Sequence, residues 1–187
     1  MTAESDLWVF GYGSLMWRPG FDFAERTLAT VRGYRRALCV YSHVHRGTPE
    51  RPGLVLGLDR GGSCKGVAFR VPAAQAADVV SYLRAREQVT MVYREITART
   101  TLADGREVQA LSYAVDRTHI QYAGALALPD LVRCVQQGQG LSGANPDYVR
   151  ATYEHMVQLG IDDRLLAAVV DGLASEPDPA RSRAGKA

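Results

Sequence analysis

The sequence has little of what marks exported or membrane proteins. Its 187 residues hold three cysteines, Cys39, Cys64 and Cys134, which form no CxxC pair and, being odd in number, fit free thiols better than a disulfide framework. The N-terminus carries acidic residues where a signal peptide carries basic ones, and no stretch approaches the ~20 uninterrupted apolar residues of a membrane span. We therefore expect neither export nor a membrane partner, and we favour the cytoplasm.

Charge of one sign is also lacking, since 22 Lys and Arg against 20 Asp and Glu leave a net charge of +2. Nucleic-acid binding relies on many uncompensated cations, so we expect no nucleic-acid partner. The chain is 47% hydrophobic and 22% charged, as one ordinary globular domain is, and is long enough to form a core without disulfides or metal. We expect a single domain over residues 1–174 and a disordered tail over 175–187, which is rich in Pro, Ser, Gly and Ala.

The order of predicted elements indicates an α+β fold. Period-two patterns and turn residues predict strands at 7–12, 29–45, 54–58, 66–71, 89–99 and 107–115, with a Gly61-Gly62 turn between the third and fourth. Helical patterns follow Pro72, cover 128–137, run from an Asn145 N-cap to Gly160, and begin again at Asp162 or Asp163. Because the chain lacks βαβ alternation, we expect a mainly antiparallel or mixed sheet curled towards a barrel.

A glycine-rich segment, Tyr12-Gly13-Ser14-Leu15, ends the first predicted strand. Its successive backbone N–H groups are suited to binding an anion. The segment fails as a dinucleotide fingerprint, because G-x-G-x-x-G would need glycine where Met16 stands. Glycines that serve only a tight turn are the alternative interpretation.

Glu87 falls on the apolar face of the helix predicted after Pro72, four residues after Leu83 and eight after Val79. A carboxylate there loses water on folding, which raises its pKa and makes it a stronger general base. The structural alternative is an ion pair with one of three arginines, Arg84, Arg86 or Arg94, or a helix end at which the apolar face has already reached solvent. The pattern alone leaves both interpretations open.

Three histidine and cysteine residues share one face of the predicted strand 29–45: Cys39, His43 and His45. This arrangement permits two metal ligands or a Cys–His nucleophilic pair. No third ligand stands at a characteristic spacing, so we favour a core cysteine and polar strand residues, and we expect no metal site.

Arg46 and Tyr148 are two further candidates for binding a ligand. Arg46 precedes a Gly-Thr-Pro turn and is suited to gripping a carboxylate, although a solvated arginine is the usual case. Tyr148 lies in the first turn of a predicted helix, where its hydroxyl can reach a site.

The ordered set of motifs resembles the ChaC-like γ-glutamylcyclotransferases, which degrade glutathione. The matching segments span about residues 7–173 and read VFGYGSLMWRP at 9–19, RGTPE at 46–50, PGLVLGL at 52–58, YLRARE at 82–87, QY at 121–122, GQG at 138–140, NPDY at 145–148 and GIDD at 160–163.

The resemblance implies a lyase that cleaves glutathione to 5-oxoproline and Cys-Gly without cofactor or metal. It implies the family's mixed fold, a small barrel-like sheet flanked by helices. Residue by residue, it implies that the Tyr12–Leu15 loop holds the γ-glutamyl moiety, that Glu87 is the general acid/base, and that Arg46 and Tyr148 bind substrate. Family members can carry a second acid about nine residues earlier; Asp78 stands there, and its role is open.

Two alternatives to a glutathione-specific enzyme remain from the sequence. One is a broader γ-glutamyl-peptide or γ-glutamylamine cyclotransferase, and the other is a non-catalytic module that binds a γ-glutamyl metabolite. Oligomeric state, rate and regulation are not readable from the sequence.

Overall fold

The computed structural model describes residues 5–88 and 90–175. Its elements, in chain order, are β1 (Leu7–Gly11), the 3-10 turn η1 (Ser14–Met16), β2 (Glu25–Ser42), β3 (Gly53–Val71), α1 (Ala73–Glu87), β4 (Tyr93–Leu102), β5 (Glu107–Val115), α2 (Leu128–Gln137), β6 (Gln139–Gly140), β7 (Gly143–Ala144), α3 (Asn145–Gln158) and α4 (Arg164–Ser175). The described residues fall into two compact units. The first holds the chain up to Val40 together with Leu56–Gly124, and the second holds Tyr41–Val55 and the chain from Ala125 onward.

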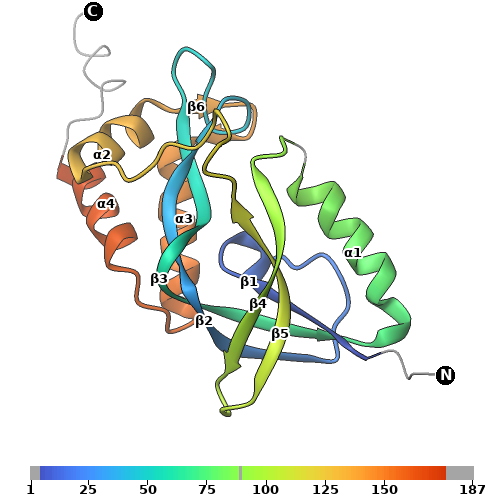
Figure 1. Ribbon diagram of the computed structural model, residues 1–187. Helices are drawn as coiled ribbons and strands as arrows, with labels where there is room; N and C mark the ends of the chain where they lie inside the picture. The colour runs from blue at the N-terminus through green and yellow to red at the C-terminus, as the bar shows by residue number, and fades with distance from the viewer. Residues whose placement is uncertain (1–4, 89, 176–187) are drawn as a thin grey trace, which may run out of the picture. The chain divides into compact units, whose positions relative to one another are not determined.

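Five strands close a barrel in the order β1-β3-β2-β4-β5 (Figure 1). β1 closes it, because it pairs antiparallel with β3 and parallel with β5. β4 and β5 pair antiparallel along their length as a hairpin. The prediction of an α+β fold with a mixed, barrel-like sheet is therefore confirmed, whereas the single domain over 1–174 stays a prediction.

Large apolar side chains fill the core of the first unit, among them Phe10, Leu58, Phe69 and Leu83, all fully buried. Burying each such side chain contributes about 1.5–3 kcal/mol. This core fixes the end of β1 and the inner face of α1, and those two elements carry the residues discussed below.

Several strand predictions are wrong at their boundaries; the strand predicted at 89–99, for example, is β4, Tyr93–Leu102. β3 is a single strand, Gly53–Val71, and the predicted turn lies inside it. Gly61 and Gly62 have φ values of 100° and 75°, which glycine adopts readily, and the strand continues through them. β2 ends at Ser42, whose hydroxyl accepts a hydrogen bond from the backbone N–H of Arg46 at 2.9 Å. The chain turns there, so His43 and His45 lie outside the strand.

α1 begins directly after Pro72, as the sequence predicts. Proline has no side chain that can cap a helix, and Asp6 takes over this role: its carboxylate accepts a hydrogen bond from the Ala73 N–H at 3.1 Å. Val79 and Leu83 are buried, which confirms the predicted inner face. α1 ends at Glu87.

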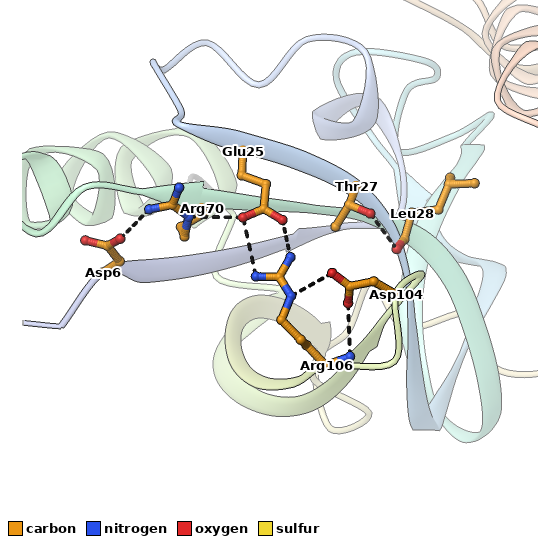
Figure 2. A network of polar contacts seen from close by, with 7 residues as sticks. All are labelled: Asp6, Glu25, Thr27, Leu28, Arg70, Asp104 and Arg106. Atoms are coloured by element: carbon orange, nitrogen blue, oxygen red, sulfur yellow. Dashed lines mark hydrogen bonds and ion pairs between the residues drawn. The ribbon is translucent and has the colours of Figure 1, made fainter.

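A network of charged side chains joins the chain before β1, the start of β2, the end of β3 and the β4–β5 turn (Figure 2). Arg70 pairs with Asp6 at 2.6 Å and with Glu25 at 3.1 Å. Arg106 pairs with Glu25 and Asp104 and lies over the ring of Trp8. The hydrogen bonds from Arg70 and Arg106 lower the pKa values of Asp6 and Glu25. The network connects four separate segments at one end of the barrel.

In the second unit α2, α3 and α4 contact one another. The contact of α4 with α2 is close at Gly172, where a Cβ atom would lie 2.6 Å from Val132. The predicted start of the last helix is confirmed, because the Asp163 carboxylate accepts the Leu166 N–H at 3.0 Å. α4 includes Ser175, and residues 176–187 of the expected tail lie outside the described residues.

Asn145 is not the N-cap that the sequence predicts. It is the first residue of α3 and is fully buried. Its side chain accepts the Leu54 N–H at 2.7 Å and donates to the Leu54 carbonyl at 2.8 Å. The Asn145 side chain therefore satisfies both backbone groups of Leu54 in β3, as a neighbouring strand would.

None of the described helices is both long enough and apolar enough to cross a membrane.

Candidate active site

The predicted glycine-rich loop follows the last residue of β1. Gly11 is needed for the turn, because a Cβ atom there would lie 2.9 Å from the Leu15 Cβ. A Cβ atom at Gly13 would meet no atom closer than 3.7 Å, so this position does not require glycine for space. Tyr12 and Leu15 are buried, while Ser14 is exposed. The loop thus has an anchored side and an open side.

Backbone groups of this loop are partly satisfied by the protein. Arg36 donates to the Tyr12 carbonyl at 2.6 Å, and Met16 donates its N–H to the Gly13 carbonyl at 2.9 Å. Within residues 5–88 and 90–175, the structure gives no acceptor for the N–H groups of Gly13, Ser14 and Leu15. These three donors at the start of η1 are available to an anion, as at the start of any helical turn.

Glu87 is the last residue of α1, and its side chain is only 19% exposed. Burial raises the pKa of its carboxyl group, and the positive charge of Arg86 opposes that effect without reversing it. Among the described residues, Glu87 has one charged partner, the Arg86 Nε at 3.2 Å, and no hydrogen-bond donor. It is a carboxylate short of water and of donors, which is the condition for a strong general base.

Of the three arginines left open as ion-pair partners, Arg86 is the one that Glu87 contacts. Arg84 pairs with Glu95 at 2.7 Å, and Arg94 pairs with Asp116 at 2.6 Å. The predicted ion pair therefore exists, with Arg86 as the partner of Glu87. A single contact without an aligned hydrogen bond does not overcome burial, however, so the general-base interpretation also stands.

Arg86 connects Glu87 to the glycine-rich loop. Its Nη2 donates to the Ser14 hydroxyl at 3.0 Å. Its Nη1 donates to the carbonyls of Arg18 at 2.6 Å and Pro19 at 3.2 Å, and to the Tyr82 hydroxyl at 3.1 Å. The structure therefore brings the loop and the carboxylate together through one guanidinium.

Asp78 does not join this group. It is exposed, and nine residues of α-helix are two and a half turns, so it lies on the face of α1 opposite to Glu87 and about 13 Å along the axis. A second carboxylate for the same reaction would have to lie elsewhere.

Tyr113 of β5 is a buried residue whose hydroxyl donates to Glu95 at 3.3 Å. Burial raises its pKa, with the charges of Glu95 and Glu87 acting in the same direction. The phenol therefore lies within electrostatic reach of Glu87 and stays protonated.

Arg46 and Tyr148 lie together in the second unit. The Arg46 guanidinium lies over the Tyr148 ring, 5.3 Å from its centroid. Its Nη1 donates to the Ser142 carbonyl at 2.5 Å, between β6 and β7. The predicted site residues thus form two groups: the loop with Glu87 in the first unit, and this pair in the second.

The histidine and cysteine candidates do not form a site. Burial raises the pKa of Cys39 to about 12, so its thiol is not a nucleophile near neutral pH. His43 stacks on Tyr41, whereas His45 contacts the Ser142 hydroxyl. Within the part of the chain that the structure describes, no three His, Cys, Asp or Glu side chains gather as metal ligands.

A model of the ChaC-like protein family matches residues 7–175. The chain belongs to the ChaC-like family. Two relatives of this ChaC-like protein are the glutathione-specific γ-glutamylcyclotransferase of Escherichia coli and the glutathione-specific γ-glutamylcyclotransferase 1 of Homo sapiens. The first is 33% identical over 160 residues, which are 86% of this chain and 69% of the relative; the second is 33% identical over 175 residues, which are 90% and 79%.

Solved structures share the fold of this ChaC-like protein. A selenomethionine-labelled γ-glutamyl cyclotransferase specific to glutathione, from yeast, superposes with a TM-score of 0.81 and covers 91% of this chain and 96% of its own. The sequences are 22% identical, so this likeness concerns the fold alone.

Two residues of the ChaC-like site were not predicted as such from the sequence. The sequence predicts Arg86 only as a possible structural partner for Glu87, and it does not single out Tyr113. The adjacency of Arg86 to a carboxylate on an apolar face was the available signal. Nothing local marks Tyr113, because its contact with Glu95 depends on strand register.

Proposed function

We propose that this ChaC-like protein is a glutathione-specific γ-glutamylcyclotransferase, a lyase that releases 5-oxoproline and Cys-Gly. The observation that carries the proposal is Glu87, which is short of water and hydrogen bonds and is linked by Arg86 to a loop with three available N–H donors. A binding module for an amino-acid head group has little use for such a carboxylate. The names of the E. coli and human relatives support glutathione as substrate.

The reaction is intramolecular. The α-amine nitrogen of the glutamyl residue attacks its own δ-carbonyl carbon, and the new C–N bond closes a five-membered ring. The bond from that carbon to the cysteine nitrogen then breaks. Glu87 takes the proton that the attacking amine loses and returns it to the leaving nitrogen, so atoms and protons balance without a cofactor.

Two effects contribute to the rate in this proposal. The amine and the δ-carbonyl already belong to one molecule, so the site contributes by holding the glutamyl chain folded with these two groups aligned for attack. Proton transfer through Glu87 contributes about 10²- to 10⁴-fold.

The other predicted residues bind substrate in this proposal. The free N–H groups of Gly13, Ser14 and Leu15, in the loop that begins at Tyr12, hold the α-carboxylate or the developing oxyanion. In the second unit, Arg46 offers a charge for a carboxylate, with its guanidinium supported by Tyr148.

We also propose a cytoplasmic setting. The three cysteines are free thiols, which suits a reducing compartment, where glutathione is in its thiol form.

The test is to incubate purified protein with glutathione and with γ-glutamyl-alanine, and to measure 5-oxoproline together with the released amine. We expect release from glutathione and little from γ-glutamyl-alanine. Equal release from both would make the protein a broader γ-glutamyl-peptide cyclotransferase. Binding of glutathione without any 5-oxoproline would indicate a non-catalytic module.

A further inference from the structure

We propose that Arg86 is a positioning residue, which orients the Ser14 hydroxyl as a hydrogen-bond donor and the Glu87 carboxylate as an acceptor on the two sides of the reacting amide. This inference rests on the proposed function and goes beyond it. It states that a residue which does not touch substrate decides which side chain of the site donates a hydrogen bond and which accepts one.

Most of the hydrogen-bonding capacity of Arg86 is already used by the protein. Its side chain is 23% exposed, and each of its three nitrogens contacts a protein atom. An arginine that binds a carboxylate frequently does so with two parallel N–H groups. Arg86 instead offers them to carbonyl and hydroxyl oxygens, so its role is to hold other groups.

The contact with Ser14 fixes the direction of a hydrogen bond. A guanidinium can only donate, so the Ser14 oxygen is the acceptor at 3.0 Å. The hydroxyl proton of Ser14 then points away from Arg86 and is free to donate. Because the donor is charged, this hydroxyl is a stronger donor than an isolated serine.

The contact with Glu87 works in the opposite sense. Arg86 is the single charged partner of this carboxylate within the described residues, and it favours the ionised form. Across from α1, the group that faces Glu87 electrostatically is Tyr113 of β5, whose hydroxyl is bonded to Glu95, and Glu95 is paired with Arg84. Arg86 therefore keeps Glu87 able to accept a proton.

The remaining contacts of Arg86 hold Arg18 and Pro19, which follow the glycine-rich loop, against α1. The carbonyls of Arg18 and Pro19 accept from Nη1, and Gly20, with φ of 77°, lies so close to Tyr82 that a Cβ atom would be 2.0 Å from its hydroxyl. Removing the guanidinium releases one end of the loop. A misplacement of about 1 Å in a positioned group can cost about 10²-fold in rate.

The test compares Arg86→Gln and Arg86→Lys with a matched control, Arg84→Gln, which removes the same charge from the same turn of α1 but frees Glu95 instead. For each we would measure kcat and KM for glutathione, the pH profile of kcat, and amide hydrogen exchange over residues 12–20. Ser14→Ala and the double variant Ser14→Ala/Arg86→Gln complete a cycle.

Arg86→Gln should lower kcat by about 10²-fold with a smaller change in KM. It should also move the acid limb of the pH profile to higher pH, because the charge that favours ionised Glu87 is gone. Arg86→Lys should keep the acid limb and still lose kcat, since one ammonium cannot reach all five oxygens that the guanidinium contacts. The loss of kcat in the double variant should be smaller than the product of the losses in the two single variants.

Amide hydrogen exchange over residues 12–20 should accelerate in both Arg86 variants and not in Arg84→Gln.

Wild-type kcat, pH profile and loop exchange in Arg86→Gln would overturn the inference, and so would equal losses in Arg84→Gln. If the wild-type protein forms no 5-oxoproline, the proposed function fails by itself. The exchange measurement then still decides whether Arg86 holds the loop.

Discussion

Asp59 and Glu87, two carboxylates of the first unit, have lost most of their water, and their pKa values move in opposite directions. Asp59 of β3 is 1% exposed and Glu87 of α1 is 19% exposed. Burial pushes both pKa values upward, yet the pKa of Asp59 is lowered overall, because Arg117, the Arg60 N–H and Arg35 donate to it or carry opposite charge. Burial alone therefore does not mark a functional carboxylate.

The difference lies in the donors that surround each group. Asp59 accepts from Arg117 at 2.7 Å, from Arg35 at 2.9 Å, from the Arg60 N–H at 2.9 Å and from the Tyr122 hydroxyl at 3.2 Å. These groups tie β2, β3 and the chain after β5 together. Glu87 has one ion pair and keeps the capacity to exchange a proton. The comparison separates a structural carboxylate from the one proposed to be catalytic, and the following changes test it.

The largest effect should come from Glu87→Gln. The amide cannot carry a proton between the two nitrogens, so turnover of glutathione should fall by about 10²- to 10⁴-fold, while the folded state persists. The measurement is 5-oxoproline release at saturating substrate. Asp78→Asn is the matched control, because it makes the same chemical change on the opposite face of α1 and should turn over at the wild-type rate. Undiminished release by Glu87→Gln would contradict the general-base role.

Asp59→Ala should affect stability instead of chemistry. Removing one member of a buried ion pair costs about 3–5 kcal/mol, and we expect the lower end because Arg35 and Arg117 are half exposed and can regain water. Urea unfolding measures the loss, and kcat per folded molecule should stay at the wild-type value. A large loss of kcat in the fully folded variant would show that Asp59 also serves the site.

The two carboxylates should give opposite slopes of stability against pH. The folded-state pKa of Glu87 is raised above its ordinary 4.5, so its contribution is fully present below that pH and is lost as pH rises through the folded pKa. The pKa of Asp59 is lowered from 3.8, so its contribution is present above that pH and is lost as pH falls. Between pH 4 and 8, the free energy of unfolding of Glu87→Gln should therefore rise relative to that of the wild type as the pH increases.

Asp59→Asn supplies the opposite case in the same experiment. Its free energy of unfolding should fall least below that of the wild type in acid and most near neutral pH. Parallel curves for the wild type and both variants would show that neither pKa departs from its unfolded value.

The smallest effect should come from an exposed pair. Arg99 and Glu107 are paired across the β4–β5 hairpin, and both are largely exposed. Arg99→Gln should leave the Tm and turnover unchanged within error, because water and salt compensate such pairs. A clear fall in Tm would mean that exposed ion pairs also hold the barrel, and would weaken the contrast between the buried groups.

Much of this arrangement was predictable from local patterns. The strand and helix periods place β1, α1 and α2 close to their observed bounds, and the apolar face of α1 singles out Glu87. The contacts of Arg86 with residues 14–19 were not predictable, because those residues are distant from it in sequence.

Residues with two possible local roles caused the errors. Asn145 precedes a proline at a helix start, as a cap residue does, and only the approach of β3 makes it a strand partner. Gly61-Gly62 has the composition of a tight turn, and only the register of the surrounding strands keeps it inside β3. The role of such residues depends on what the fold brings against them.

The position of Glu87 as the last residue of α1 has one more consequence. The carbonyl groups at the end of a helix carry about half a negative charge, which acts against a carboxylate placed there and favours arginine nearby. The backbone of α1 therefore adds to the basicity that burial confers, and Arg84 and Arg86 in the last turn limit the cost to the helix. Extending α1 by one turn beyond Glu87 would move this negative end away and weaken the base without altering a single side chain that contacts it.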